Sequence, residues 1–190
     1  MDKITPYVED RMLKFDEAIT GERIQNYLTK INSWLKGMTA EGKPFAYFLQ
    51  DLCRQHGVNQ IWMLATVQKE QSALFRATPP PDRVINKILG YGIMETGTLP
   101  GYAGFEKQFK SAIKQFSKYD SWGQVVNYDT YVVKLYDDAE DRAELKQKGI
   151  KFTGSYIAGN KAEAKALLYT PRLAPLVQMG ELFKEIEGVI

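Results

Sequence analysis

The sequence predicts a mainly α-helical fold with one small β element, and three kinds of observation support this class. Apolar residues recur at helical spacing along most of the 190-residue chain. Several of these stretches begin at residue types that cap helices. Only the region near 130–157 is rich in β-prone residues, and there we expect a hairpin or small sheet. The prediction is an α+β fold dominated by helices, in a single domain over residues 1–190.

The first 56 residues predict three helices. Thr5 and Pro6 fit a capping residue followed by a first-turn proline, which predicts a helix to about Ala18. Thr20 caps a second helix, whose inward face carries Ile24, Tyr27, Leu28, Ile31 and Leu35. Pro44 opens a third, with Phe45, Phe48, Leu49 and Leu52 turned inward. We expect the helices within residues 1–40 to pack on the rest of the domain.

The middle of the chain predicts a capped helix, a breaker and a glycine turn. Asn59 caps a fourth helix that carries Glu70 near its end. Three prolines at 79–81 interrupt the helical pattern. A short helix over 84–89 leads into the glycine-rich turn at 90–92, and apolar spacing predicts another helix over 105–116.

The last third contains the predicted hairpin and two helices. Residues 131–135 and 150–153 are β-prone, and the charged stretch 137–148 separates them. Asn160 caps a helix that runs to about Tyr169, where Thr170 and Pro171 end it. A final helix carries Leu176, Met179, Phe183 and Ile186 on its inward face.

Composition and charge exclude several classes of function. The formal net charge of +2 is too small to indicate nucleic acid as a partner. No apolar run reaches membrane-spanning length, and residues 1–6 lack the apolar core of a signal peptide. We therefore expect no membrane span. Work outside a cell would then need phage-type release, a non-Sec route, or a leader already removed.

The single histidine and the single cysteine limit metal chemistry. Zinc sites take three or four protein ligands, largely from these two residue types. We therefore expect no metal and no cofactor. Cys53 lies among apolar residues and fits a small buried hydrophobe, and Gly57 places His56 in the last turn of a helix.

Glu70 is the strongest candidate for catalysis. It follows an apolar helical face formed by Ile61, Leu64 and Ala65. A carboxyl group beside such a face loses water, and this loss favours its protonated form. A carboxyl that keeps its proton near neutral pH can serve as a general acid.

Three segments together resemble the lysozyme-like superfamily, in particular lytic transglycosylases and muramidases of bacterial and phage cell-wall lytic proteins. The family pattern is a catalytic Glu closely followed by Ser, then a Gly-hydrophobic-Met-Gln turn, then an Ala-Tyr element. Here Glu70 and Ser72 match the first element with Gln71 between them. Residues 92–95 match the second, with Glu95 where Gln is usual, and Tyr169 ends an alanine-rich helix like the third. The resemblance covers roughly residues 19–116 and 156–172.

The resemblance implies roles for these residues. Glu70 would be the acid, and Glu95 either a second catalytic carboxylate or a residue that only supports the glycine turn. Substrate binding would fall to Gln71, Ser72, Tyr91, Gly92, Met94, Tyr156 and Tyr169. Each also has a plainer structural interpretation, as a surface, cap, turn or core residue.

The expected function is cleavage of peptidoglycan at the β-1,4 bond between N-acetylmuramic acid and N-acetylglucosamine. The partners would be glycan strands of the bacterial cell wall, and the chain would act as a monomer. A hydrolase needs a second carboxylate, whereas a lytic transglycosylase lets the muramoyl 6-hydroxyl attack. A non-catalytic glycan-binding module and a glucosaminidase that cuts the other β-1,4 bond remain alternatives.

Overall fold

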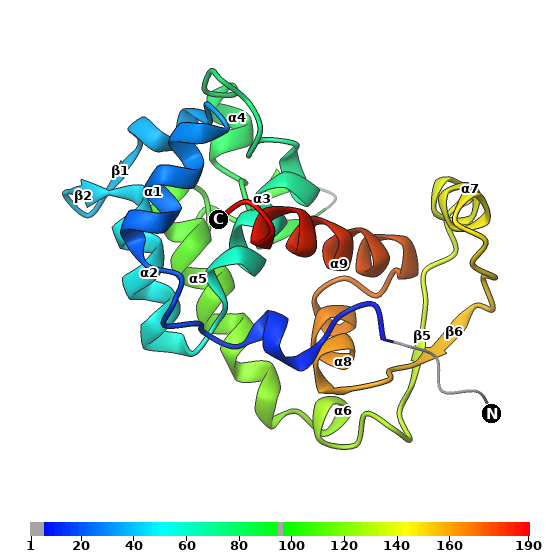
Figure 1. Cartoon of the computed structure of the whole chain (residues 1–190). Coiled ribbons are helices and arrows are strands. Elements are labelled where there is room, and N and C mark those ends of the chain that lie inside the picture. The colour runs from blue at the N-terminus through cyan, green and yellow to red at the C-terminus, as the bar shows by residue number, and fades with distance from the viewer. Residues whose placement is uncertain (1–5, 95–96) are drawn as a thin grey trace.

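Helices build most of the structure, a computed structural model described over residues 6–94 and 97–190 (Figure 1). The α-helices are α1 (Gly21–Lys30), α2 (Phe45–His56), α3 (Gln60–Gln71), α4 (Asp82–Ile85), α5 (Phe105–Lys118), α6 (Gly123–Val126), α7 (Ala139–Gln147), α8 (Lys161–Tyr169) and α9 (Leu173–Glu187). Short 3-10 helices are η1 (Asp10–Leu13), η2 (Trp34–Gly37) and η3 (Tyr119–Ser121). The predicted mainly α class is confirmed.

Short antiparallel strand pairs complete the described elements. They are β1 (Thr39–Ala40) with β2 (Lys43–Pro44), β3 (Ile93–Met94) with β4 (Gly97–Thr98), and β5 (Val132–Lys134) with β6 (Ser155–Ile157). The third pair is the hairpin expected near 130–157. Its register sets Val132 opposite Ile157 and Val133 opposite Tyr156. The second strand was predicted at 150–153 and instead begins at Ser155.

The charged stretch between these two strands forms α7, which the sequence pattern did not predict. The Asp138 side chain caps this helix by accepting a hydrogen bond from the Glu140 amide at 2.8 Å. Arg172 then pairs with the buried carboxylate of Asp141 through two bonds of 2.8 and 2.6 Å. Leu145 is fully buried, and so few inward residues leave little helical periodicity to detect.

The predicted helix over residues 6–18 is wrong. In its place, Asp10–Leu13 forms a single 3-10 turn, and the flanking backbone is extended. The backbone here bonds to the loop between α2 and α3: the Phe15 amide donates to the Gly57 carbonyl at 3.1 Å, and the Asn59 amide donates to Leu13 at 3.1 Å. Because these partners satisfy the chain without helical bonds, tertiary contacts override the local helix signal.

Helix α3 occupies the centre of the core. Every residue from Gln60 to Val67 is buried, so the helix is enclosed on all sides. It packs against α9, which crosses it in Figure 1. Only its last turn, residues 68–71, is partly exposed. The core therefore fixes the direction in which this turn leaves the protein interior.

Asn59→Ala should lower the free energy of unfolding by about 2–3 kcal/mol. The Asn59 side chain accepts from the amides of Ile61 and Trp62 at 2.8 and 3.3 Å, and it donates to the Lys14 carbonyl at 2.9 Å. The measurement is urea unfolding followed by circular dichroism. Thr20→Ala is the matched control, because Thr20 caps α1 through one bond of 3.2 Å and should cost about 1 kcal/mol. Equal losses of unfolding free energy in the two variants would contradict the view that Asn59 both caps α3 and binds the Lys14 carbonyl.

Candidate functional site

Glu70 lies in the last turn of α3, where the helix emerges from the core. Its side chain keeps 21% of its exposure, and that of the neighbouring Lys69 keeps 11%. The carboxylate therefore has one side against protein and another that solvent can reach. This is the position that a group acting on an external substrate requires.

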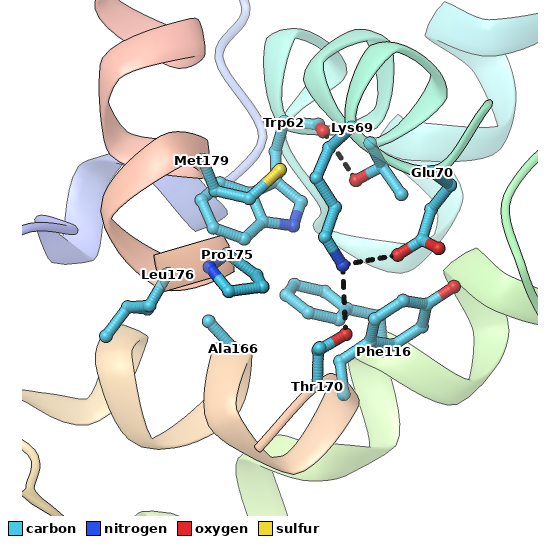
Figure 2. A pocket seen from close by; sticks show the side chains of 11 residues that line it. Trp62, Lys69, Glu70, Phe116, Ala166, Thr170, Pro175, Leu176 and Met179 are labelled. Carbon is cyan, nitrogen blue, oxygen red and sulfur yellow. Dashed lines mark hydrogen bonds and ion pairs between the residues drawn. The ribbon is translucent and has the colours of Figure 1, made fainter. Parts of the chain in front are cut away.

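Lys69 pairs directly with Glu70. Its ammonium donates to Glu70 Oε1 at 2.6 Å and to Thr170 Oγ1 at 3.3 Å, and Figure 2 shows it between these two partners. The sequence suggested only loss of water around the carboxyl. The structure adds an ion pair that holds Glu70 Oε1 in place.

The space beside Lys69 and Glu70 is small and largely apolar (Figure 2). Its volume is about 20 Å³, and its walls include Trp62, Phe116 and Met179. A cavity of this size holds about one water molecule. A sugar ring does not fit, so a polymeric substrate can meet Glu70 only from its solvent-facing side.

The glycine turn lies against the other side of the Glu70 carboxylate. Gly90 has a φ of +69°, a conformation that favours glycine. A Cβ atom at Gly90 would stand 2.6 Å from Glu70 Oε2 and 3.0 Å from its Cδ. Both the backbone conformation and the missing side chain are therefore needed for the carboxylate to lie here.

Tyr169 connects helix α8 to the same turn. Its hydroxyl donates a hydrogen bond of 2.7 Å to the carbonyl of Leu89, the residue before Gly90. Burial raises the pKa of Tyr169 well above its ordinary value, and the negative charge of Glu70 adds to the effect. The hydroxyl therefore keeps its proton and remains a donor. Of the residues proposed from sequence, Glu70 and Tyr169 are brought together with the glycine turn.

Gln108 holds the glycine turn in place, and the sequence analysis missed it. Its amide donates to the carbonyls of Tyr91 at 2.8 Å and Tyr102 at 2.7 Å. Its oxygen accepts from the amides of Leu89 and Tyr91, both at 3.2 Å. The side chain is fully buried on α5. The sequence did contain one sign of this role, because Gln108 is a polar residue on the otherwise apolar face of the predicted helix over 105–116.

Ser72 and Gln71 end helix α3 beside Glu70. Ser72 adopts a left-handed conformation with φ 48°, and its amide donates to the Gln68 carbonyl at 2.8 Å. Its side chain is exposed and makes no hydrogen bond to Glu70 in the described structure. Gln71, the last helical residue, is partly buried. Ser72 is therefore the C-cap residue of α3 in this structure.

The other residues proposed from the glycine turn are only partly described. Tyr91 packs edge to face on Tyr102 with ring centroids 5.0 Å apart. Gly92 has a φ of +69°, and a Cβ atom at this position would stand 2.5 Å from the Tyr102 ring. The absence of a side chain at Gly92 therefore lets the Tyr102 ring pack here. The backbone of Met94 pairs with Gly97 in the β3–β4 turn. Glu95 lies outside the described residues.

Tyr156 belongs to a different cluster. Its hydroxyl donates to the buried carboxylate of Glu163 at 2.9 Å, and the amides of Tyr7 and Gly159 donate to the same group at 2.6 and 2.8 Å. Burial, followed by the charge of Glu163, raises the pKa of Tyr156. The hydroxyl therefore holds the hairpin to helix α8, away from Glu70.

In residues 6–94 and 97–190, no group of three or more His, Cys, Asp or Glu side chains gathers to bind a metal ion. Cys53 is buried, and burial raises the pKa of its thiol. His56 ends α2, where burial and then the charge of Lys114 lower its pKa. Across the same residues, no helix combines the length and apolar character needed to span a membrane.

Comparison of the chain with protein-family models, curated proteins and solved structures finds no match.

Gly90→Ala should lower the free energy of unfolding by at least about 1 kcal/mol more than Gly42→Ala does. Both glycines have positive φ, +69° and +75°, so both substitutions carry the left-handed penalty. Only at Gly90 does the new methyl group meet a side chain, because nothing lies within 4 Å of a Cβ at Gly42. Urea unfolding measures both.

A double-mutant cycle provides the control for this comparison. In a Glu70→Ala background the excess cost at Gly90 should disappear, because the clashing carboxylate is gone. An excess that persists there would mean that Gly90 is constrained by something other than Glu70.

Proposed function

We propose that this chain is a glycosidase that cleaves the β-1,4 bond between N-acetylmuramic acid and N-acetylglucosamine in peptidoglycan, with Glu70 as the general acid. The observation that supports the proposal most is a convergence of three elements. The partly exposed carboxylate of Glu70 lies against Gly90, and the Tyr169 hydroxyl donates to the Leu89 carbonyl one residue earlier. These are the segments that carry the resemblance to lytic transglycosylases and muramidases.

The chemistry asks Glu70 to give its proton to the leaving glycosidic oxygen. In the resting site its carboxylate is paired with Lys69 at 2.6 Å. The ammonium has a second acceptor in Thr170 Oγ1, 3.3 Å away. It can therefore stay hydrogen-bonded when the carboxyl turns toward a substrate.

The fate of the oxocarbenium-like centre distinguishes two reactions. In a hydrolase a second carboxylate activates water or acts as nucleophile. Glu95 is the candidate because it ends the sequence motif 92–95, which follows Gly90 in the chain. In a lytic transglycosylase the muramoyl 6-hydroxyl attacks, and no second carboxylate is needed. The masses of the released fragments separate the two, since anhydro products are about 18 mass units lighter.

Glu70→Gln should reduce lysis of purified cell walls by about 10²–10⁴-fold while leaving the fold intact. The change preserves size and removes the dissociable proton. Turbidity loss of a wall suspension measures the rate, and circular dichroism checks the fold.

Glu181→Gln is the matched control for this substitution. Glu181 is also paired with a lysine, Lys148 at 2.6 Å, but its side chain on α9 is 56% exposed. The Glu181→Gln protein should lyse walls as fast as the unmodified chain. A Glu70→Gln protein that keeps more than about a hundredth of the lytic activity would refute the acid role. Binding to walls without lysis by the unmodified chain would instead identify a non-catalytic glycan-binding module.

A further inference from the structure

The hairpin formed by β5 and β6 encloses a second and larger cavity against helix α8. This hairpin pocket has a volume of about 250 Å³, against about 20 Å³ for the space beside Glu70. Leu167, Leu168 and Pro171 form part of its apolar wall, and Tyr131 and Val133 face them from the hairpin side. The volume is close to the lower limit for pockets that hold small molecules, about 300 Å³. It suits one sugar ring rather than a longer ligand.

The polar groups of the hairpin pocket are available to a ligand. Gln124 and Lys134 line it, and within the described residues neither side chain has a hydrogen-bond or ion-pair partner. Tyr131 keeps 42% of its exposure, so part of its ring is open to solvent. An apolar wall, an aromatic ring and a few convergent polar groups are the usual components of a small-molecule site.

The segment that carries the hairpin is rich in exposed apolar side chains. Six of the eleven exposed large hydrophobic side chains in the described structure lie between residues 122 and 157, namely Trp122, Val126, Tyr131, Val132, Tyr136 and Ile157. Of these six, Tyr131 lines the pocket. A tyrosine combines an apolar ring face with a hydroxyl that can form a hydrogen bond.

Helix α8 and the two residues after it lie between the hairpin pocket and the space beside Glu70. Ala166, Tyr169 and Thr170 line the space beside Glu70, whereas Leu167, Leu168 and Pro171 line the hairpin pocket. The two spaces are therefore on different faces of the same segment, and a helix with its side chains is about 10–12 Å across.

We infer that the hairpin pocket binds an N-acetylated sugar of a glycan strand, outside the position at which the strand is cleaved. The inference rests on the proposed function for the identity of the polymer. The Tyr131 ring would cover the sugar face, the Gln124 amide and the Lys134 ammonium would bond to the acetamido and hydroxyl oxygens, and Leu168 and Pro171 would pack on the ring. This gives residues 122–157 a role in substrate binding.

The test is an NMR titration of the isotope-labelled Glu70→Gln protein with a trimer of β-1,4-linked N-acetylglucosamine. The Glu70→Gln background prevents cleavage, so binding is read without any need for activity. Amide shifts should gather at Gln124, Tyr131, Val133 and Leu168. Tyr131→Ala should raise the dissociation constant measured at these amides by about three- to tenfold, which is the effect expected for the loss of one aromatic stacking contact. Gln124→Ala should also raise this dissociation constant.

Tyr136→Ala is the matched control, because Tyr136 follows the same strand, is 67% exposed and does not line the pocket. It should leave binding unchanged. Shifts confined to the surroundings of Glu70, no shifts at all, or shifts produced only by a peptidoglycan stem peptide would each overturn the inference. If the unmodified chain lyses no wall but the trimer binds in the hairpin pocket, the proposed function is refuted and the pocket inference stands. If the unmodified chain lyses walls but no trimer binds in the pocket, the pocket inference is refuted and the proposed function stands.

Discussion

Burial of helix α3 on every side is the constraint on which the candidate site depends. Eight consecutive residues from Gln60 to Val67 have no exposed face, so the helix can neither rotate nor slide without opening the core. Asn59 fixes its start and the left-handed Ser72 fixes its end. The last turn therefore presents Glu70 at one position on the surface, and the remaining elements are arranged around it.

The glycine turn meets this carboxylate because two side chains from other helices hold it there. Gln108 on α5 makes two hydrogen bonds to Tyr91 in the turn, one to the Leu89 amide before it and one to the Tyr102 carbonyl, and Tyr169 on α8 makes one to the Leu89 carbonyl. Buried polar groups with all partners satisfied specify a unique arrangement more strongly than apolar packing does. The contact between Gly90 and Glu70 is thus set by the core and does not depend on the turn alone.

Much of the helical framework could be predicted from the sequence, because capping residues and apolar spacing act locally. Thr20, Asn59 and Asn160 all cap helices as expected, and the hairpin lies in the predicted region. The failures have a common cause in long-range contacts. The segment 6–18 bonds to the loop before α3, and α7 depends on an ion pair with Arg172 more than on its own periodicity.

The candidate site shows the same division between local and long-range information. Glu70, the glycine turn and Tyr169 are conspicuous in sequence, and the structure places all three in one region. Lys69 as the ion-pair partner could not be predicted. Adjacent residues on a helix point in different directions, so their spacing gives no sign that the Lys69 ammonium reaches Glu70 Oε1 as well as Thr170 Oγ1. Gln108 was hidden because a single amide in an apolar stripe gives no periodic signal.

Four consecutive residues, the last of helix α8 and the three after it, connect the site to the hairpin region, since each bonds to a different part of the molecule. The bonds are Tyr169 to Leu89, Thr170 to Lys69, Pro171 to the amide of Tyr136, and Arg172 to Asp141. The first two reach the Glu70 site, and the last two anchor the hairpin and α7. A shift of this segment would move both regions at once. The placement of residues 122–157 is therefore coupled to the geometry around Glu70, although their sequence shares nothing with the motifs that surround that carboxylate.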